Sequence, residues 1–125
     1  MPDILKVSNI QRRFGGLKAV DDVSFSVARG DILGLIGPNG AGKTTLFNLL
    51  MGLYASQGGR IELEGRDVNG LRPHQIAALG MTKTFQNVAL FPEMTVLDNV
   101  LVGGLLRHDV PQQARWRATA WTAWV

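Results

Sequence analysis

Cysteine is absent from the 125-residue sequence, so disulfide bonds and thiolate metal sites are excluded. Long apolar runs are absent too: the longest, near VLVGGLL, falls far short of the roughly 20 residues that a membrane-spanning helix needs. The opening MPDILKVSNIQRR lacks a basic region followed by a long apolar segment, so we expect no signal peptide. Any association with a membrane is therefore expected to go through a partner.

A strong charge of one sign is also missing. The formal net charge is +3, and the basic residues of the main body are neither clustered nor interleaved with aromatic side chains. Such a diffuse excess is typical of a solvated surface, which argues against a nucleic-acid partner. What remains is 46% apolar residues over the length of one ordinary domain, a composition typical of a globular protein.

Five segments have the patterns of β-strands. The clearest is VSFSV, in which Val23, Phe25 and Val27 alternate with two serines. DILKVSNI alternates more loosely, and ILGLIG is a short apolar run of the kind that is buried on both faces of a sheet. The expected strands are residues 3–10, 23–27, 32–37, 60–65 and 81–85.

Three segments have helical patterns with recognisable ends. Leu46, Leu49 and Leu50 share one helical face, and a glycine follows them. A second segment has a proline near its first turn and a glycine at its close. Thr95 and Asp98 have the spacing of a capping box, which predicts the start of a third helix. The expected helices are residues 43–52, 71–80 and 95–104.

The order strand, loop, helix, strand, helix, strand predicts an α/β domain with a partly parallel sheet, which we assign to residues 1–106. The composition changes in residues 107–125, which hold all three tryptophans of the chain. This tail has either the pattern of an amphipathic helix that packs on the domain or the character of a non-native end. His74 and His108 receive no functional role.

The stretch GLIGPNGAGKTT contains the motif G-x-x-x-x-G-K-[ST], formed by Gly37, Gly42, Lys43 and Thr44, between an apolar run and an expected helix. Its glycines let the backbone approach a ligand closely, so that successive amide N–H groups point at an anion. The helix N-terminus favours negative charge, the Lys43 ammonium can reach the β- and γ-phosphates, and the Thr44 hydroxyl can bind Mg²⁺. The motif predicts a site for a nucleoside triphosphate with its magnesium.

The sequence around this motif resembles the ATP-binding cassettes of ABC transporters. RRFGGLKAVDDVSFSVARGDILGLIGPNGAGKTTLFNLLMGLY is similar to the opening of the cassettes that power branched-chain amino-acid importers, and GLRPHQIAALGMTKTFQNVALFPEMTVLDNVLVGG continues the match. The resemblance runs from about Ile4 to Gly104. It implies an α/β P-loop NTPase fold that is incomplete here: the N-terminal strands, the Walker A strand, loop and helix, the Q-loop and the start of the helical subdomain.

The resemblance implies an ATP-binding role for two groups of residues. Phe14 falls where the family places an aromatic ring that stacks on adenine, and Val20 flanks the same base. The residues expected to wrap the phosphates are Asn39, Gly40, Ala41, Gly42, Lys43, Thr44 and Thr45.

The resemblance also implies which residues assist hydrolysis. Gln86, in TFQN, matches the Q-loop glutamine, whose amide reaches Mg²⁺ and helps to place the attacking water. Lys43 and Gln86 are the expected catalytic residues, and Thr44 and Gln86 are the expected magnesium ligands. Lys83 stands where this subfamily usually has arginine, which keeps the charge.

Three elements that this family needs for hydrolysis have no match in the sequence: a Walker B strand ending in Asp and Glu, an LSGGQ signature and a switch histidine. YASQGG has the residues of a signature in the wrong order, and AVDD has too short an apolar run for a Walker B strand. MTVLDN belongs to the segment that Thr95 caps. We therefore expect Mg-ATP binding with little turnover, from the N-terminal half of an importer ATPase about twice as long. Two alternatives stay open: a truncated nucleotide-binding remnant that does not hydrolyse ATP, and another ABC-class ATPase of the DNA-repair or chromosome type.

The resemblance implies three partners. These are membrane permease subunits, which dock at a groove that includes NVALFPEMTV, a second cassette in a head-to-tail dimer and, indirectly, a solute-binding protein outside the cell membrane. The implied location is cytoplasmic, on the inner face of that membrane. The expected solute is a branched-chain amino acid or a similar small molecule.

Overall fold

The computed structural model describes residues 2–84 and 89–104 and divides the chain into two compact units, residues 1–83 and 84–125. The predicted boundary after residue 106 and the tail that follows it lie outside the described residues. Among the residues that the structure describes, no helix combines the length and apolar content needed to cross a bilayer.

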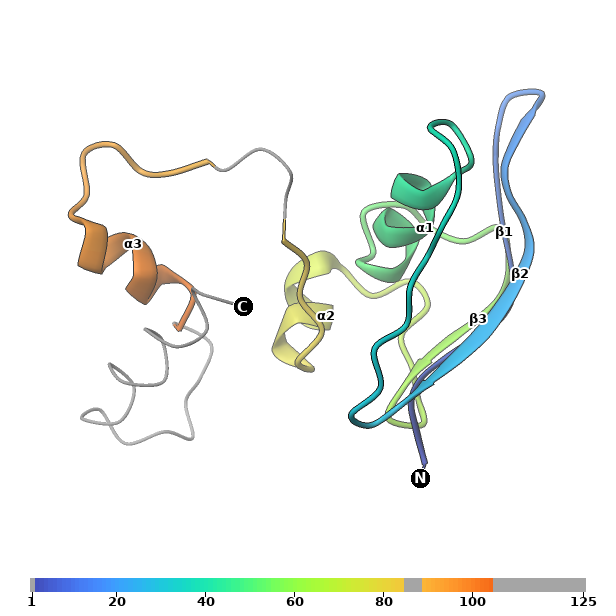
Figure 1. Ribbon diagram of the computed structural model, residues 1–125, viewed down its shortest axis with the longest axis horizontal. Coiled ribbons are helices and arrows are strands. Elements are labelled where there is room, and N and C mark those ends of the chain that lie inside the picture. The colour runs from blue at the N-terminus through green and yellow to red at the C-terminus, as the bar shows by residue number, and fades with distance from the viewer. Residues whose placement is uncertain (1, 85–88, 105–125) are drawn as a thin grey trace. The chain divides into compact units, whose positions relative to one another are not determined.

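An antiparallel sheet of four strands is the framework of the first unit (Figure 1). The order across the sheet is β2-β1-β3-β4, so β1 has a neighbour on both edges. The prediction of a partly parallel sheet is wrong for the described strands, because each pair of neighbours runs antiparallel. The strands are β1 (Asp3–Phe14), β2 (Leu17–Ala28), β3 (Gly58–Leu63) and β4 (Arg66–Asp67).

A bulge in β1 explains why its buried residues do not alternate strictly. Asn9 has a φ of 50° and lies within the register shift between Val7 and Ile10. The Asn9 side-chain amide donates to Asp22 Oδ1 at 2.8 Å, and the Asn9 backbone N–H donates to Ser24 Oγ at 2.7 Å. The extra residue therefore lets Val7 and Ile10 both point into the core, where the simple period of two would separate them.

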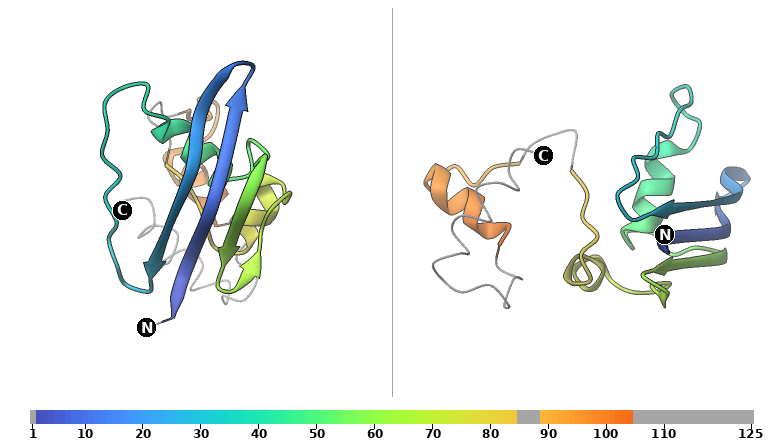
Figure 2. Two further views of the ribbon diagram at one scale, coloured as in Figure 1. Left: turned by 90° about the vertical axis from the view of Figure 1, so that its right-hand side faces the viewer. Right: turned by 60° about the horizontal axis from the view of Figure 1, so that its bottom comes forward.

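Two helices complete the first unit, α1 (Lys43–Leu50) and α2 (Pro73–Ala78). α1 lies against one face of the sheet (Figure 2) and buries the leucine face that the spacing predicts. The predicted alternation in β2 is confirmed, since Val23 and Phe25 pack against the core while Ser24 and Ser26 are exposed. The core consists of Val7, Ile10, Val20, Leu46, Leu49, Leu50, Ile61, Leu63, Val68 and Ile76.

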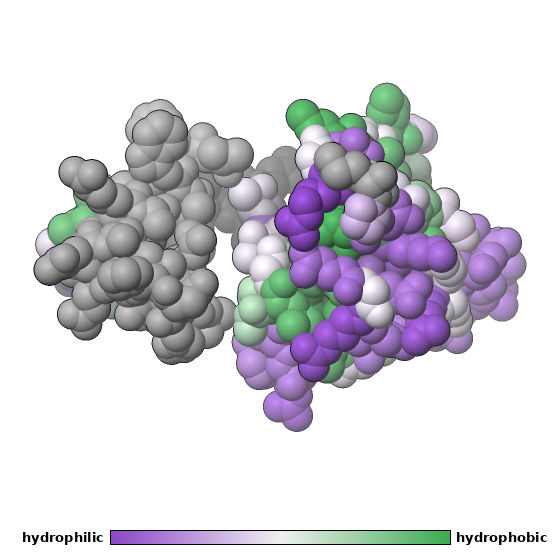
Figure 3. Space-filling model, turned by 90° about the horizontal axis from the view of Figure 1, so that it is seen from below, coloured by the Kyte–Doolittle hydropathy of each residue, from purple (hydrophilic) through white to green (hydrophobic). Residues whose placement is uncertain are grey.

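Two predicted strands do not form. Residues 32–37 follow an irregular path outside the sheet (Figure 2), and Ile32 and Ile36 are 100% and 97% exposed instead of buried. The reason is the absence, within the described chain, of any strand that pairs with this segment. Residues 81–84 likewise have no strand, and residue 85 lies outside the described chain. Hydrophobic patches accordingly reach the surface of the first unit among hydrophilic side chains (Figure 3).

The second unit contains α3 (Val96–Val102), which begins where the capping spacing predicts. Thr95 Oγ1 accepts the backbone N–H of Asp98 at 3.1 Å and donates to the Asp98 carboxylate at 2.7 Å. The Asn99 amide closes the loop before the helix by accepting from the Phe91 N–H and donating to the Thr95 carbonyl. Since α3 buries no side chain among the described residues, these local hydrogen bonds define its start.

Candidate functional site

The loop between residues 37 and 42 reverses direction into α1 by means of two glycines with positive φ. Gly40 has a φ of 86° and Gly42 has a φ of 91°, and the Ala41 N–H donates to the Pro38 carbonyl at 3.2 Å. A Cβ added to Gly42 would overlap with the Ala19 carbonyl oxygen of β2. Gly42 therefore meets two demands at once, a left-handed backbone and a close approach of the helix start to the β1–β2 hairpin.

The start of α1 concentrates hydrogen-bond donors. The first helical bond runs from the Leu46 N–H to the Gly42 carbonyl at 2.9 Å, and no acceptor among the described residues pairs with the amides of Lys43, Thr44 and Thr45. The Lys43 ammonium bends back over the loop, where it donates to the carbonyls of Gly37 and Pro38, the latter at 2.9 Å.

Three amides without a described acceptor and the positive end of the helix dipole therefore lie at the start of α1, next to the Lys43 ammonium and with no acidic residue in the first turn. This donor set fits a polyphosphate, whose oxygens accept hydrogen bonds and carry negative charge. We call residues 37–45 the phosphate cradle.

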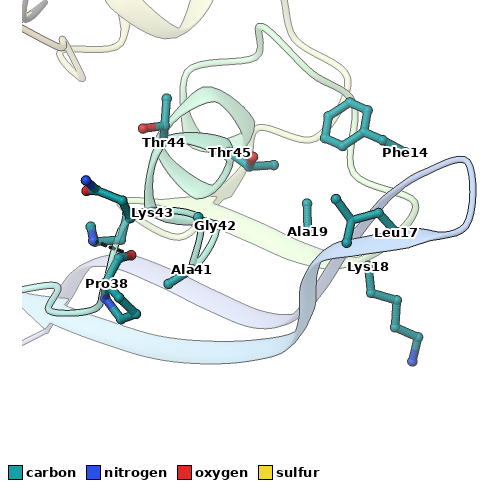
Figure 4. Close-up of a pocket in the computed structure, with 12 residues that line it drawn as sticks. Phe14, Leu17, Lys18, Ala19, Pro38, Ala41, Gly42, Lys43, Thr44 and Thr45 are labelled. Carbon is teal, nitrogen blue, oxygen red and sulfur yellow. Dashed lines mark hydrogen bonds between the residues drawn. The ribbon is translucent and has the colours of Figure 1, made fainter.

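A pocket of ≈ 480 Å³ joins the phosphate cradle to the β1–β2 hairpin (Figure 4). Phe14, 40% exposed, lies at the hairpin end of this pocket, opposite the start of α1. Lys18 also borders the pocket, but its side chain points away from α1 and pairs with Asp21 at 2.9 Å. The remaining lining comes from Leu17, Ala19 and residues 38–45.

The structure therefore brings together most of the residues that the sequence singles out. Phe14 and the phosphate-binding set from Asn39 to Thr45 all line this pocket. Val20 does not: it is 5% exposed, lies in the hydrophobic core and is not among the lining residues. Gln86 lies outside the described residues. Lys83, shortly before it, donates to Asn48 Oδ1 of α1 at 3.0 Å.

Two further residues contact Phe14 and were missed by sequence reasoning. The Tyr54 ring lies edge-on to the Phe14 ring, with centroids 5.2 Å apart and planes at 75°. The Arg12 guanidinium lies 4.8 Å from the Phe14 centroid and 5.4 Å from the Tyr54 centroid. No motif signals these contacts; the only cue in the sequence is an aromatic residue in the turn that follows the phosphate-loop helix.

With the fold and the pocket described, comparison with known families gives the class of the protein. The family model for the ABC transporter matches residues 20–125, which is most of the chain. The chain therefore belongs to the ABC transporter family.

Individual relatives narrow this class. The chain is 52% identical over 99 residues to the high-affinity branched-chain amino acid transport ATP-binding protein BraF of Pseudomonas aeruginosa. That match covers 79% of this chain and 39% of the relative. It is 43% identical over 109 residues to a probable branched-chain amino acid transport ATP-binding protein LivG of Methanocaldococcus jannaschii, covering 87% of this chain and 42% of that protein. The chain thus spans less than half the length of these relatives.

Solved structures confirm the predicted fold class. The ADP conformation of MJ1267, an ATP-binding cassette of an ABC transporter, matches with a TM-score of 0.77 and 38% identity over 94% of this chain and 46% of that one. A nucleotide-free ATP-binding cassette from an ABC transporter matches with a TM-score of 0.75 and 35% identity, covering 99% of this chain and 49% of that one. The antiparallel sheet, the phosphate cradle and α1 are therefore part of a cassette fold.

Proposed function

We propose that the chain is the nucleotide-binding part of the ATP-binding subunit of an importer for branched-chain amino acids or similar small solutes. The observation that carries this proposal is the pocket lined both by an exposed aromatic ring and by the start of α1, whose first amides have no acceptor among the described residues. An adenine nucleotide has the matching two ends, a flat base and a chain of anionic oxygens.

Each part of the pocket has a role in this proposal. Phe14 stacks on the base, and the amides of residues 39–45 with the Lys43 ammonium hold the phosphates. Bound Mg²⁺ would neutralise charge on the phosphate oxygens, with the Thr44 hydroxyl and the Gln86 amide as its proposed ligands. The donor set of the cradle supports this assignment, since it contains no carboxylate that would repel a triphosphate.

The solute and the partners are proposed from the relatives. BraF and LivG are described as branched-chain amino acid transport ATP-binding proteins, which supports the same solute class here. A permease is the proposed docking partner, and a second cassette is the proposed dimer partner. The second unit supports the permease contact because it exposes apolar side chains before and within α3, namely Leu90, Phe91, Met94, Val96 and Leu97. The subunit would then sit on the cytoplasmic side of the membrane.

Binding and hydrolysis are separable in this proposal. Residues 1–125 contain the cradle but no Walker B carboxylates and no LSGGQ signature, so we expect hydrolysis to require residues that this chain does not supply. A phosphate-release assay with Mg-ATP addresses this point. Release above background that disappears in Lys43→Ala would contradict it.

Isothermal titration calorimetry with Mg-ATP tests the binding proposal. Lys43→Ala removes the ammonium of the cradle and is expected to weaken binding about 10- to 100-fold, the range for hydrogen bonds to a charged group. Lys18→Ala is the matched control, because Lys18 borders the same pocket but points away and pairs with Asp21. The control should bind within about twofold of the unmodified chain. Absence of binding by the unmodified chain, or equal binding by Lys43→Ala, would refute the proposal.

A further inference from the structure

Phe14 lines the pocket from the β1–β2 hairpin, whereas most of the lining comes from the phosphate cradle. It is the last residue of β1, opposite Leu17 across the Gly15–Gly16 turn, and a ring at the tip of a hairpin has few backbone neighbours. Its orientation therefore depends on side-chain contacts. The Tyr54 ring and the Arg12 guanidinium both contact it, and neither of these residues lines the pocket.

Tyr54 is attached to the same helix as the phosphate cradle. The N–H groups of Leu53 and Tyr54 both donate to the Asn48 carbonyl, at 2.9 and 3.3 Å, so the Tyr54 backbone is fastened to the last turn of α1. The cradle lies at the first turn of the same helix. Contact with Tyr54 consequently fixes the Phe14 ring relative to the cradle, although Phe14 and the cradle come from different parts of the chain.

Arg12 strengthens this connection from the sheet. Its Nη1 donates to the Ala55 carbonyl at 2.8 Å, which ties β1 to the segment that carries Tyr54. Its guanidinium lies within cation–π range of both rings. The Arg12 Nε is buried and has no hydrogen-bond partner in the described part of the chain. The guanidinium is thus placed by its contact with the rings and by one hydrogen bond.

We infer that Tyr54 and Arg12 are positioning residues that hold the Phe14 ring where the base of a cradle-bound nucleotide stacks on it. They determine how much the base adds to affinity and leave the phosphate contribution unchanged. This inference rests on the proposed function, since it assumes that the cradle binds the phosphates.

The test compares two ligands by calorimetry on the full chain: Mg-ATP, which has a base, and magnesium tripolyphosphate, which has none. The unmodified chain should bind ATP more tightly than tripolyphosphate. Tyr54→Leu removes the edge-on ring and should weaken ATP binding about 2- to 10-fold, the range for an aromatic pair, with tripolyphosphate binding unchanged. Tyr54→Phe keeps the ring and should bind both ligands as the unmodified chain does.

Arg12→Met provides a second variant on a different element. It removes the cation and the bond to Ala55, and the same selective loss of ATP affinity is expected. Tripolyphosphate binding reports that each variant is folded around its cradle. Equal losses for both ligands in both variants would overturn the inference, as would an unmodified chain that binds the two ligands equally. Failure of the unmodified chain to bind either ligand, with no effect of Lys43→Ala, would instead refute the proposed nucleotide site.

Discussion

Ile10 and Ile32 lie in two predicted strands of the same unit, yet the Ile10 side chain is 0% exposed and the Ile32 side chain is 100% exposed. Ile10 belongs to β1, whose backbone is paired with β2 on one edge and with β3 on the other. Residues 32–37 have no strand beside them in the described chain. The difference shows that a segment with a strand pattern becomes a buried strand only when other segments satisfy its backbone N–H and C=O groups.

The largest change in the free energy of unfolding is expected for Ile10, with Ile32 as its matched control. Ile10→Ala leaves a cavity in the core and should lower the free energy of unfolding by about 2–5 kcal/mol. The matched variant Ile32→Ala alters a fully exposed side chain and should change it by no more than about 0.5 kcal/mol. Urea unfolding followed by far-UV circular dichroism measures both. Equal losses would show that residues 32–37 are packed in solution and would break the comparison.

Two glycines of the phosphate cradle sharpen the comparison, because they share a backbone conformation but differ in surroundings. Gly42→Ala places a methyl group against the Ala19 carbonyl and strains a φ of 91°, so a loss of about 3 kcal/mol in unfolding free energy is expected. Gly40→Ala has the strain of φ 86° but meets nothing within 4 Å, so about 1 kcal/mol is expected. Thermal unfolding of the two variants measures the difference. If Gly40→Ala cost more, crowding by Ala19 would not be the reason for glycine at position 42.

The smallest change in stability is expected in α3. Like residues 32–37, α3 has no buried side chain among the described residues, yet it forms a regular helix. Thr95→Ala removes its N-cap hydrogen bond, and the expected cost is about 1 kcal/mol of local helix stability. Hydrogen exchange at the amides of Asp98 and Asn99 should then become about fivefold faster. Thr82→Ala, an exposed threonine outside any helix, is the control and should leave these rates unchanged. Unchanged rates in Thr95→Ala would show that the cap does not hold the helix.

Features encoded by neighbours in sequence were predicted well. The leucine face of α1, the alternation in β2 and the Thr95 cap each depend on residues a few positions apart, and the structure confirms them. The strands predicted at residues 32–37 and 81–85 are absent from the described residues of these segments, because strand formation there depends on pairing with distant segments. The bulge at Asn9 escaped prediction for a related reason, since it is stabilised across the hairpin by Asp22.

In the candidate site, too, features that depend on neighbouring residues were predictable, and features that depend on distant contacts were not. The phosphate cradle is one contiguous motif, and its residues line the pocket together. The meeting of Phe14 with the cradle followed from a family resemblance and not from spacing. The contacts of Tyr54 and Arg12 with Phe14 could not be predicted, because they depend on how the segment after α1 returns to β1. The proposed role of Gln86 stays a prediction.

Besides packing its leucines into the core, α1 also has a geometric role. α1 is eight residues long, begins within the cradle and ends just before the turn that bears Tyr54, so it serves as a rigid spacer of defined length and phase. One residue inserted into it would rotate the segment beyond by about 100° and move it by about 1.5 Å. The cradle would keep its shape while Tyr54 swung away from the hairpin tip. Tolerance to sequence change on the outer face of α1 should therefore coexist with intolerance to any change in its length.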